Sequence, residues 1–178
     1  MIEAPDFVWQ RFPHAASTAT ERFLRSLWGA DTRYLFDPAA TIGERRARDP
    51  GFRPAGRRIV CNIRRLPAWA VRRQQAGQTI APGEGDDMLR TYSSACVHRW
   101  VRAEHLAHDL AHAFGFEEDP VQRALAALAL PAAVDPPTRI APSHDEMDDL
   151  YRANPRWADL ERRLYGALAT ELPVRKVA

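Results

Sequence analysis

The sequence has only two cysteines and no long hydrophobic run, and each shortage excludes a class of protein. Cys61 and Cys96 show no CxxC or Cys/His spacing, which excludes a disulfide framework and a zinc ribbon. Charged residues or histidines interrupt every apolar stretch before it reaches the roughly 18 residues that a membrane-spanning helix needs. The N-terminal segment contains no basic start followed by an apolar stretch and a small-residue cleavage site. We therefore expect a cytoplasmic protein with no membrane partner.

Lysine is nearly absent as well. Lys176 is the one lysine among 25 basic residues, so positive charge is carried almost wholly by guanidinium groups, which suit phosphate or carboxylate ligands. Residues 45–73 contain ten arginines and one acidic residue, whereas residues 116–161 contain ten acidic residues and four arginines. The basic segment is therefore either a DNA- or RNA-binding surface, or a segment that faces the acidic one or is solvated. The candidate nucleic-acid-binding residues are Arg45, Arg46, Arg48, Arg57, Arg58, Arg64, Arg65, Arg72 and Arg73.

Length and hydrophobic patterning indicate an α+β fold that is mainly helical. With 178 residues, 46% of them hydrophobic, the chain can bury one sizeable core. Periodicity, β-prone runs and capping boxes at Thr18–Glu21 and Ser143–Glu146 locate the elements. The expected helices cover 19–28, 67–75, 87–114 and 119–130, with a pair in 143–178; the expected strands cover 32–36 and 58–63, with 78–80 as a third candidate. The many glycines and prolines of 38–56 predict a loop.

This pattern predicts a small sheet of short strands in the N-terminal half, packed on the long central helix 87–114, followed by a helical C-terminal part. We expect residues 1–130 to form a single globular domain. Four prolines in 131–142 predict a Pro-rich linker. Residues 143–178 are then a C-terminal helical pair that packs on the domain.

The long helix carries the most unusual feature of the sequence, a group of histidines. His98, His105, His108 and His112 lie within fifteen residues. Residues four apart on a helix project from one face, so His108 and His112 could chelate one metal ion, with Asp109 between them. The alternative is a solvated polar stripe that is rich in histidine, with Asp109 as an ordinary helix partner of His105.

Residues 108–116, His-Asp-Leu-Ala-His-Ala-Phe-Gly-Phe, resemble the active-site helix H-E-[IL]-[GA]-H-A-[LF]-G-[LF] of the zincin metallopeptidases, with Asp109 in the position of the glutamate. Glu118 stands where the extended motif of the metzincin type places its third ligand. The run from Glu118 to Pro131 is similar to the segment that follows the active helix in ImmA/IrrE-type metallopeptidases. The resemblance implies a zincin-like domain over 1–130, in which His108, His112 and Glu118 bind zinc and Asp109 acts as general base.

Three functions are consistent with these features. The first is a zinc-dependent metallopeptidase-like hydrolase that acts on a protein substrate or regulator, with activity weakened because aspartate is one methylene shorter than glutamate. The second is an Arg-rich, mainly helical nucleic-acid-binding or ribonucleoprotein accessory subunit without catalytic activity, which contacts DNA or RNA through residues 45–73. The third is an adaptor that has a zincin-like shape and has lost activity through the change to Asp109.

Overall fold

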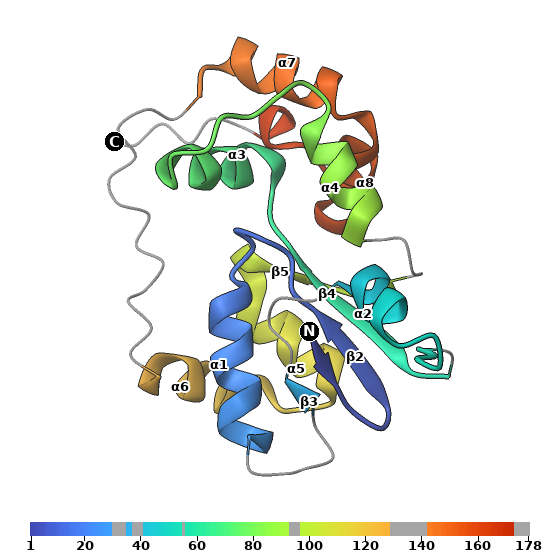
Figure 1. The fold of residues 1–178 in the computed structure, drawn as a ribbon. Coiled ribbons are helices and arrows are strands. Elements are labelled where there is room, and N and C mark those ends of the chain that lie inside the picture. Colours follow the sequence, from blue (N-terminus) through green and yellow to red (C-terminus); the bar gives the residue numbers. More distant parts are fainter. Residues whose placement is uncertain (30–34, 37–40, 55, 93–96, 129–141, 173–178) are drawn as a thin grey trace. The chain divides into compact units, whose positions relative to one another are not determined.

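The computed structural model describes residues 1–29, 35–36, 41–54, 56–92, 97–128 and 142–172. They form an α+β fold that is mainly helical, as predicted, with a small sheet in the N-terminal half (Figure 1). The chain divides into two compact units. The first unit comprises Met1–Arg64 and Thr91–Pro137, and the second unit comprises Arg65–Arg90 and Thr138–Ala178. Fully buried tryptophans lie in both, Trp9 in the first unit and Trp69 and Trp157 in the second.

The sheet belongs to the first unit and has the strand order β3-β1-β2-β4-β5. β1 (Ile2–Glu3) pairs antiparallel with β2 (Phe7–Gln10) and with β3 (Leu35–Phe36). β4 (Arg58–Ile63) pairs parallel with β2 and with β5 (Arg99–Arg102). The prediction of a strand over 58–63 is confirmed, and the described part of the expected strand 32–36 forms β3. Strands β1, β2 and β5 were not predicted, because runs of two to four residues are too short for alternation to be recognised.

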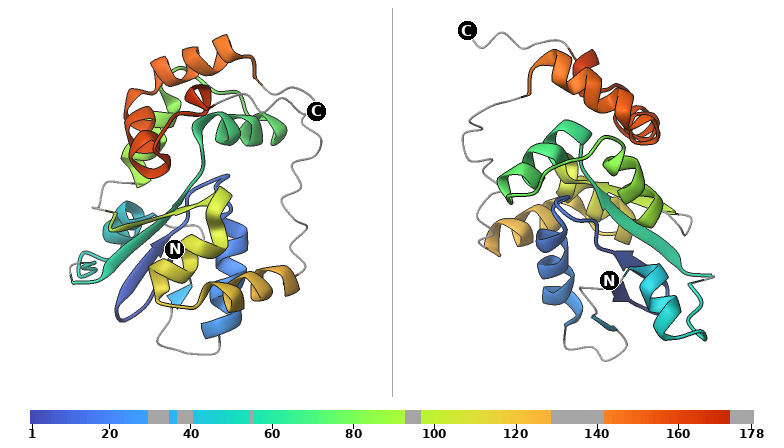
Figure 2. Two further views of the ribbon diagram at one scale, coloured as in Figure 1. Left: turned by 180° about the vertical axis from the view of Figure 1, so that it is seen from behind. Right: turned by 45° about the horizontal axis from the view of Figure 1, so that its top comes forward.

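Helices cover both faces of this sheet. α1 (Ser17–Trp28), α5 (Leu106–Phe114) and α6 (Glu118–Ala127) contribute to one core together with sheet residues such as Trp9 and Val101. The view from behind in Figure 2 shows α5 and α6 on the near side of the strands. α2 (Ile42–Arg48) covers the opposite face, where Ile42 packs with Val8 and Ile59. The apolar side of α5 thus packs on the sheet, and the polar side of α5 remains exposed.

The second unit is helical. It contains α3 (Leu66–Gln75), most of α4 (Glu84–Tyr92), α7 (His144–Ala153), α8 (Pro155–Tyr165) and a 3-10 turn at Ala169–Glu171. The rings of Trp69 and Trp157 are in contact, with centroids 4.8 Å apart. Asp86 of α4 caps α8, since its carboxylate accepts hydrogen bonds from the backbone N–H groups of Arg156 (3.0 Å) and Trp157 (2.9 Å). Residues 65–90 therefore pack with the C-terminal helices. This differs from the expected single domain over 1–130. The expected linker 131–142 lies outside the described residues except for Pro142.

The loop expected over 38–56 and the continuous helix expected over 87–114 are wrong. The loop expected over 38–56 contains α2, which begins with a capping box: Thr41 Oγ1 accepts from Glu44 N–H (3.1 Å), and Glu44 Oε2 accepts from Thr41 N–H (2.6 Å). Most glycines and prolines of this segment flank α2, so they do not prevent a helix. The helix expected over 87–114 is interrupted, because β5 and a 3-10 turn at Ala103–His105 lie between α4 and α5. Pairing with β4 overrides the helical pattern at residues 99–102.

Helix boundaries agree with the sequence in the second unit better than in the first. The helix expected over 67–75 and the capping box Ser143–Glu146 are confirmed. The second helix of the expected C-terminal pair begins at Pro155, directly after Asn154. The capping box expected at Thr18–Glu21 is not formed, because α1 begins at Ser17, whose hydroxyl instead accepts from Phe12 N–H (3.1 Å). α6 begins at Glu118, so Asp119 lies in its first turn and is not its N-cap. Residues 78–80 are not in a strand.

Candidate functional site

The structure brings together two of the predicted metal ligands, His108 and Glu118. α5 ends at Gly115, whose φ of +75° is a left-handed conformation that glycine adopts without strain. The resulting corner turns the chain into α6 and places Glu118 Oε2 2.8 Å from His108 Nδ1. Both side chains are exposed, by 57% and 51%. His112 follows one turn later on α5 and is exposed as well.

Asp109, the residue between these two histidines on α5, is buried. Its carboxylate accepts hydrogen bonds from the backbone N–H, Nε and Nη2 of Arg102, all at 2.8 Å. Burial raises the pKa of Asp109, but the hydrogen bonds and charge of Arg102 outweigh burial and hold this pKa below its ordinary value. The ion pair fastens the start of α5 to the end of β5. Both oxygens of the expected general base are thus engaged by one guanidinium group.

The remaining histidines of the group do not lie on α5. His98 precedes β5, where its backbone N–H donates to Ile59 O (2.8 Å) and its Nδ1 accepts from Ile59 N–H (3.0 Å). It therefore extends the pairing of β4 with β5. His105 ends the 3-10 turn before α5 and is exposed. The continuous histidine stripe expected on one long helix does not exist, because β5 interrupts that helix.

His108, His112 and Glu118 are not gathered as a three-ligand set. In the part of the chain that the structure describes, no group of three His, Cys, Asp or Glu side chains is placed to hold a metal ion. Glu118 contacts the Nδ1 atom of His108, which leaves the Nε2 atom of the ring for a metal. A carboxylate in this position orients a ligating imidazole and is not itself a ligand.

The arginines of 45–73 are divided between the units and are largely engaged within them. In the first unit, Arg45 Nε lies 2.7 Å from Glu3 Oε1, and Arg58 binds Asp6 and the Ala113 carbonyl. Arg45 and Arg57 also contact the Phe52 ring, with guanidinium carbons 5.2 and 5.1 Å from its centroid. Arg64 is buried, whereas Arg46 and Arg48 are exposed on α2.

In the second unit, Arg65 pairs with Glu161 at 2.9 Å and lies over the Tyr165 ring. Arg73 pairs with Glu84 and contacts Trp69, and Arg72 donates to Gln75 (3.4 Å). Most of the candidate nucleic-acid-binding residues thus hold elements of their own unit together.

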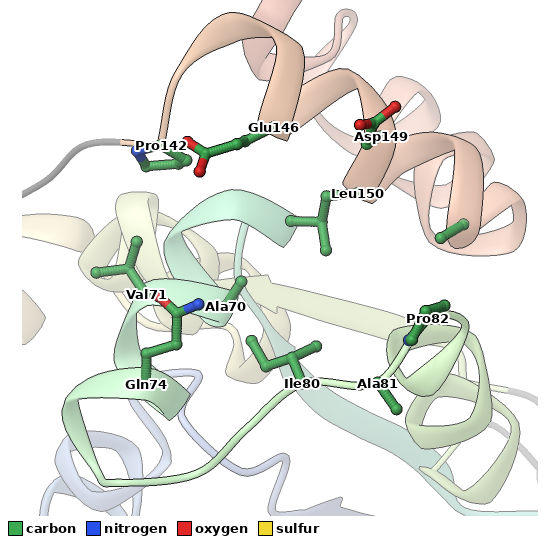
Figure 3. A pocket seen from close by; sticks show the side chains of 11 residues that line it. Ala70, Val71, Gln74, Ile80, Ala81, Pro82, Pro142, Glu146, Asp149 and Leu150 are labelled. Atoms are coloured by element: carbon green, nitrogen blue, oxygen red, sulfur yellow. The ribbon is translucent and has the colours of Figure 1, made fainter.

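A pocket of about 510 Å³ lies within the second unit and was not predicted from the sequence (Figure 3). It is lined by α3, by the segment before α4, and by one face of α7. We call this cavity the second-unit pocket; its lining residues are Ala70, Val71, Gln74, Ile80, Ala81, Pro82, Pro142, Glu146, Asp149, Leu150 and Ala153. On α7 these residues follow a 3–4 spacing that reads Glu-Asp-Leu-Ala. This stripe is acidic at one end and apolar at the other. It is the signal in the sequence that could have indicated a binding surface on this helix.

No protein-family model, curated protein or solved structure matches this chain. The resemblance of residues 108–116 to the zincin helix therefore stays a prediction from those residues. Among the described helices, none has the length and apolar character needed to cross a membrane.

Proposed function

We propose that the protein is an adaptor that binds a peptide segment of a protein partner in the second-unit pocket. The observation that carries this proposal is the pocket itself. Its volume of about 510 Å³ falls in the range of roughly 300–1,000 Å³ that is usual for ligand-binding sites. Its walls are mainly aliphatic, and a few polar groups, Gln74, Glu146 and Asp149, lie among them. This combination of apolar surface and few polar groups is typical of recognition sites.

The surroundings of α5 favour an adaptor over a hydrolase. A general base must have an oxygen free to take a proton from a reacting water. Asp109 has both oxygens on Arg102, and its lowered pKa makes it a poor base. His108 and His112 are exposed, whereas Asp109 is buried. We therefore assign Asp109 a structural role.

The test of this function is binding of a neutral apolar probe by the full chain. N-acetyl-leucinamide is titrated while backbone amide chemical shifts are recorded by NMR. We expect the shifts of Ala70, Ile80 and Leu150 to change in a saturable manner. Val71→Trp should fill the pocket and abolish the changes. Gln75→Trp, on the same helix but outside the lining, should leave them intact.

Thermal unfolding of both tryptophan variants shows whether each one is folded. The adaptor proposal is refuted if the probe leaves the pocket residues unaffected, or if Val71→Trp folds and the changes persist.

A second candidate function is divalent metal binding by His108 and His112, and it is favoured by the 2.8 Å contact between His108 and Glu118. We propose that Glu118 fixes the ring of His108 so that Nε2 and the imidazole of His112 share one ion. Zinc held there would supply a Lewis acid.

Isothermal titration of the full chain with zinc tests this candidate. We expect about one zinc per chain, with binding lost in His108→Ala and His112→Ala. His144→Ala is the matched control, because His144 is also exposed and has a carboxylate oxygen, of Asp148, 3.3 Å from its Nδ1. Equal loss in the control, or retention in both ligand variants, would contradict the site.

A further inference from the structure

The composition of the second-unit pocket identifies the kind of segment that it takes. We infer that its occupant is a positively charged, extended peptide segment that inserts aliphatic side chains. This inference rests on the proposed adaptor function and adds the chemistry of the partner. Three observations carry it: the apolar floor, the sign of the charge at the pocket, and the backbone along one edge.

The floor is aliphatic. Figure 3 shows Val71, Ile80, Pro82 and Leu150 projecting from three different segments around one space. Leu150 comes from α7 and lies above Ile80, which precedes α4. Removing apolar surface from water contributes roughly 25 cal/mol per Å². Aliphatic side chains of a partner are therefore the natural filling for this volume.

The charged groups that line the pocket are all acidic. Glu146 and Asp149 stand three residues apart on α7, and no basic residue is part of the lining. The helix as a whole carries four carboxylates and one arginine. Hydrogen bonds from the backbone N–H and hydroxyl of Ser143 hold the pKa of Glu146 below its ordinary value. Glu146 is thus charged at neutral pH. Asp149 already pairs with Arg152 on the same helix, so the charge of Glu146 is the main reason why the pocket favours lysine or arginine in the partner.

The backbone beside Ile80 favours a peptide over a small molecule. Residues 78–81 lie outside helix and strand, and Ile80 and Ala81 line the pocket. Within the described residues, the backbone groups of Thr79 and Ile80 form no hydrogen bond to the rest of the chain. An extended peptide can satisfy such groups with its own main chain, as in recognition by strand addition. Apolar side chains would then enter the pocket while alternate, basic side chains face the acids of α7.

The experiment measures binding of the full chain to three short blocked peptides by fluorescence anisotropy. The peptides share alternating leucines and differ only at the positions between them, which are all lysine, all glutamine or all glutamate. We expect the lysine peptide to bind most tightly and to lose affinity as salt rises, because screening weakens exposed charge pairs. Glu146→Gln combined with Asp149→Asn should weaken its binding about tenfold, since each exposed charge contributes modestly.

The controls separate charge at the pocket from charge elsewhere. Glutamine can still accept at position three of the capping box, so Glu146→Gln should leave α7 folded. Asp145→Asn combined with Asp159→Asn removes the same charge from exposed positions outside the lining, and binding should change less than twofold. Equal affinity for the three peptides, or equal loss in both double variants, overturns the inference.

Its failure can be told apart from failure of the adaptor function. If N-acetyl-leucinamide shifts the pocket residues but the lysine peptide has no advantage, the adaptor function stands and the charged partner is wrong. If neither probe binds, both are wrong. If the chain self-associates and Val71→Trp abolishes that association, the occupant is a second copy of this chain, and the inference of a separate basic partner is overturned.

Discussion

The two units each bury a carboxylate beside an arginine, and they hold it in opposite electrostatic conditions. In the first unit, Asp109 accepts three hydrogen bonds from Arg102 alone, and its pKa is lowered although burial opposes this. In the second unit, Glu161 is fully buried, and burial raises its pKa against hydrogen bonds from Leu66, Tyr151 and Arg65. Burial thus outweighs the arginine partner at Glu161, whereas the arginine partner outweighs burial at Asp109.

The two carboxylates also differ in how many segments they connect. Asp109 joins the end of β5 to α5, two segments that are adjacent in sequence. Glu161 connects the start of α3 to α7 and α8, since it accepts from Leu66 N–H (2.8 Å) and from the hydroxyl of Tyr151 (2.7 Å). The same hydroxyl accepts from Ala169 N–H (3.1 Å). Glu161 therefore stabilises contacts that are distant in sequence, and its removal should have the larger effect.

Glu161→Ala tests this ranking and should be the most destabilising single change. It leaves Arg65, Tyr151 and the Leu66 N–H without their acceptor in a buried place, which typically costs about 3–5 kcal/mol. Denaturant unfolding measures the change in free energy. Asp159→Ala on the same helix is exposed and should change stability by less than about 0.5 kcal/mol. If Glu161→Ala lowers the free energy of unfolding by less than about 1 kcal/mol, Glu161 does not stabilise these contacts between distant segments.

Asp109→Ala should cost less, about 2–3 kcal/mol, because Arg102 is partly exposed and water can replace the lost partner. Denaturant unfolding again supplies the measurement. Asp109→Glu separates the structural role from catalysis. The longer side chain has to displace the bidentate contact, so we expect lower stability and no gain in hydrolysis of a casein substrate. A rise in hydrolysis in the presence of zinc would restore Asp109 to the role of a weakened general base.

The pH dependence of stability should carry opposite signs for the two carboxylates. Asp109, with its pKa lowered from 3.8, contributes stability above that value and loses it as the pH falls through the lower pKa of the folded state. Glu161, with its pKa raised from 4.5, contributes stability below that value and loses it as the pH rises through the raised pKa. The free energy of unfolding is measured across the acidic pH range. In Asp109→Asn it should fall less steeply as the pH is lowered, and in Glu161→Gln it should fall less as the pH is raised. The same change of slope in both variants would contradict the opposite shifts.

Local signals in the sequence predicted the second unit better than the first. The capping box at Ser143 and the Asn154–Pro155 helix start use side chains close in sequence to the backbone that they cap, so they can be read directly. β5 depends on pairing with β4, about forty residues earlier, and no periodicity within Arg99–Arg102 reveals a distant partner. The fold class could therefore be predicted, whereas the interruption of the histidine helix could not.

The candidate site shows the same limit. Helical spacing predicted that His108 and His112 share one face, and the resemblance to the extended zincin motif implied that Glu118 lies near them. The orientation of Asp109 could not be predicted, because it depends on Arg102, whose position follows from β5. The second-unit pocket depends on α3 and α7, which are more than sixty residues apart in sequence. Spacing within one helix cannot reveal a cavity formed by two.

The smallest effect is expected at Arg46, and it extends the comparison from carboxylates to arginines. Arg46 is exposed on α2, whereas Arg65 pairs with the buried Glu161. Arg46→Ala should change the free energy of unfolding by less than about 0.5 kcal/mol, and Arg65→Ala by about 2–4 kcal/mol.

Binding of a single-stranded and a double-stranded DNA at rising salt tests whether these arginines contact nucleic acid. If the segment served nucleic acid, affinity would fall steeply with salt and Arg46→Ala together with Arg48→Ala would reduce that slope. Because Arg45, Arg58, Arg65 and Arg73 already pair with acidic residues of their own units, we expect weak binding whose dependence on salt these two substitutions leave unchanged.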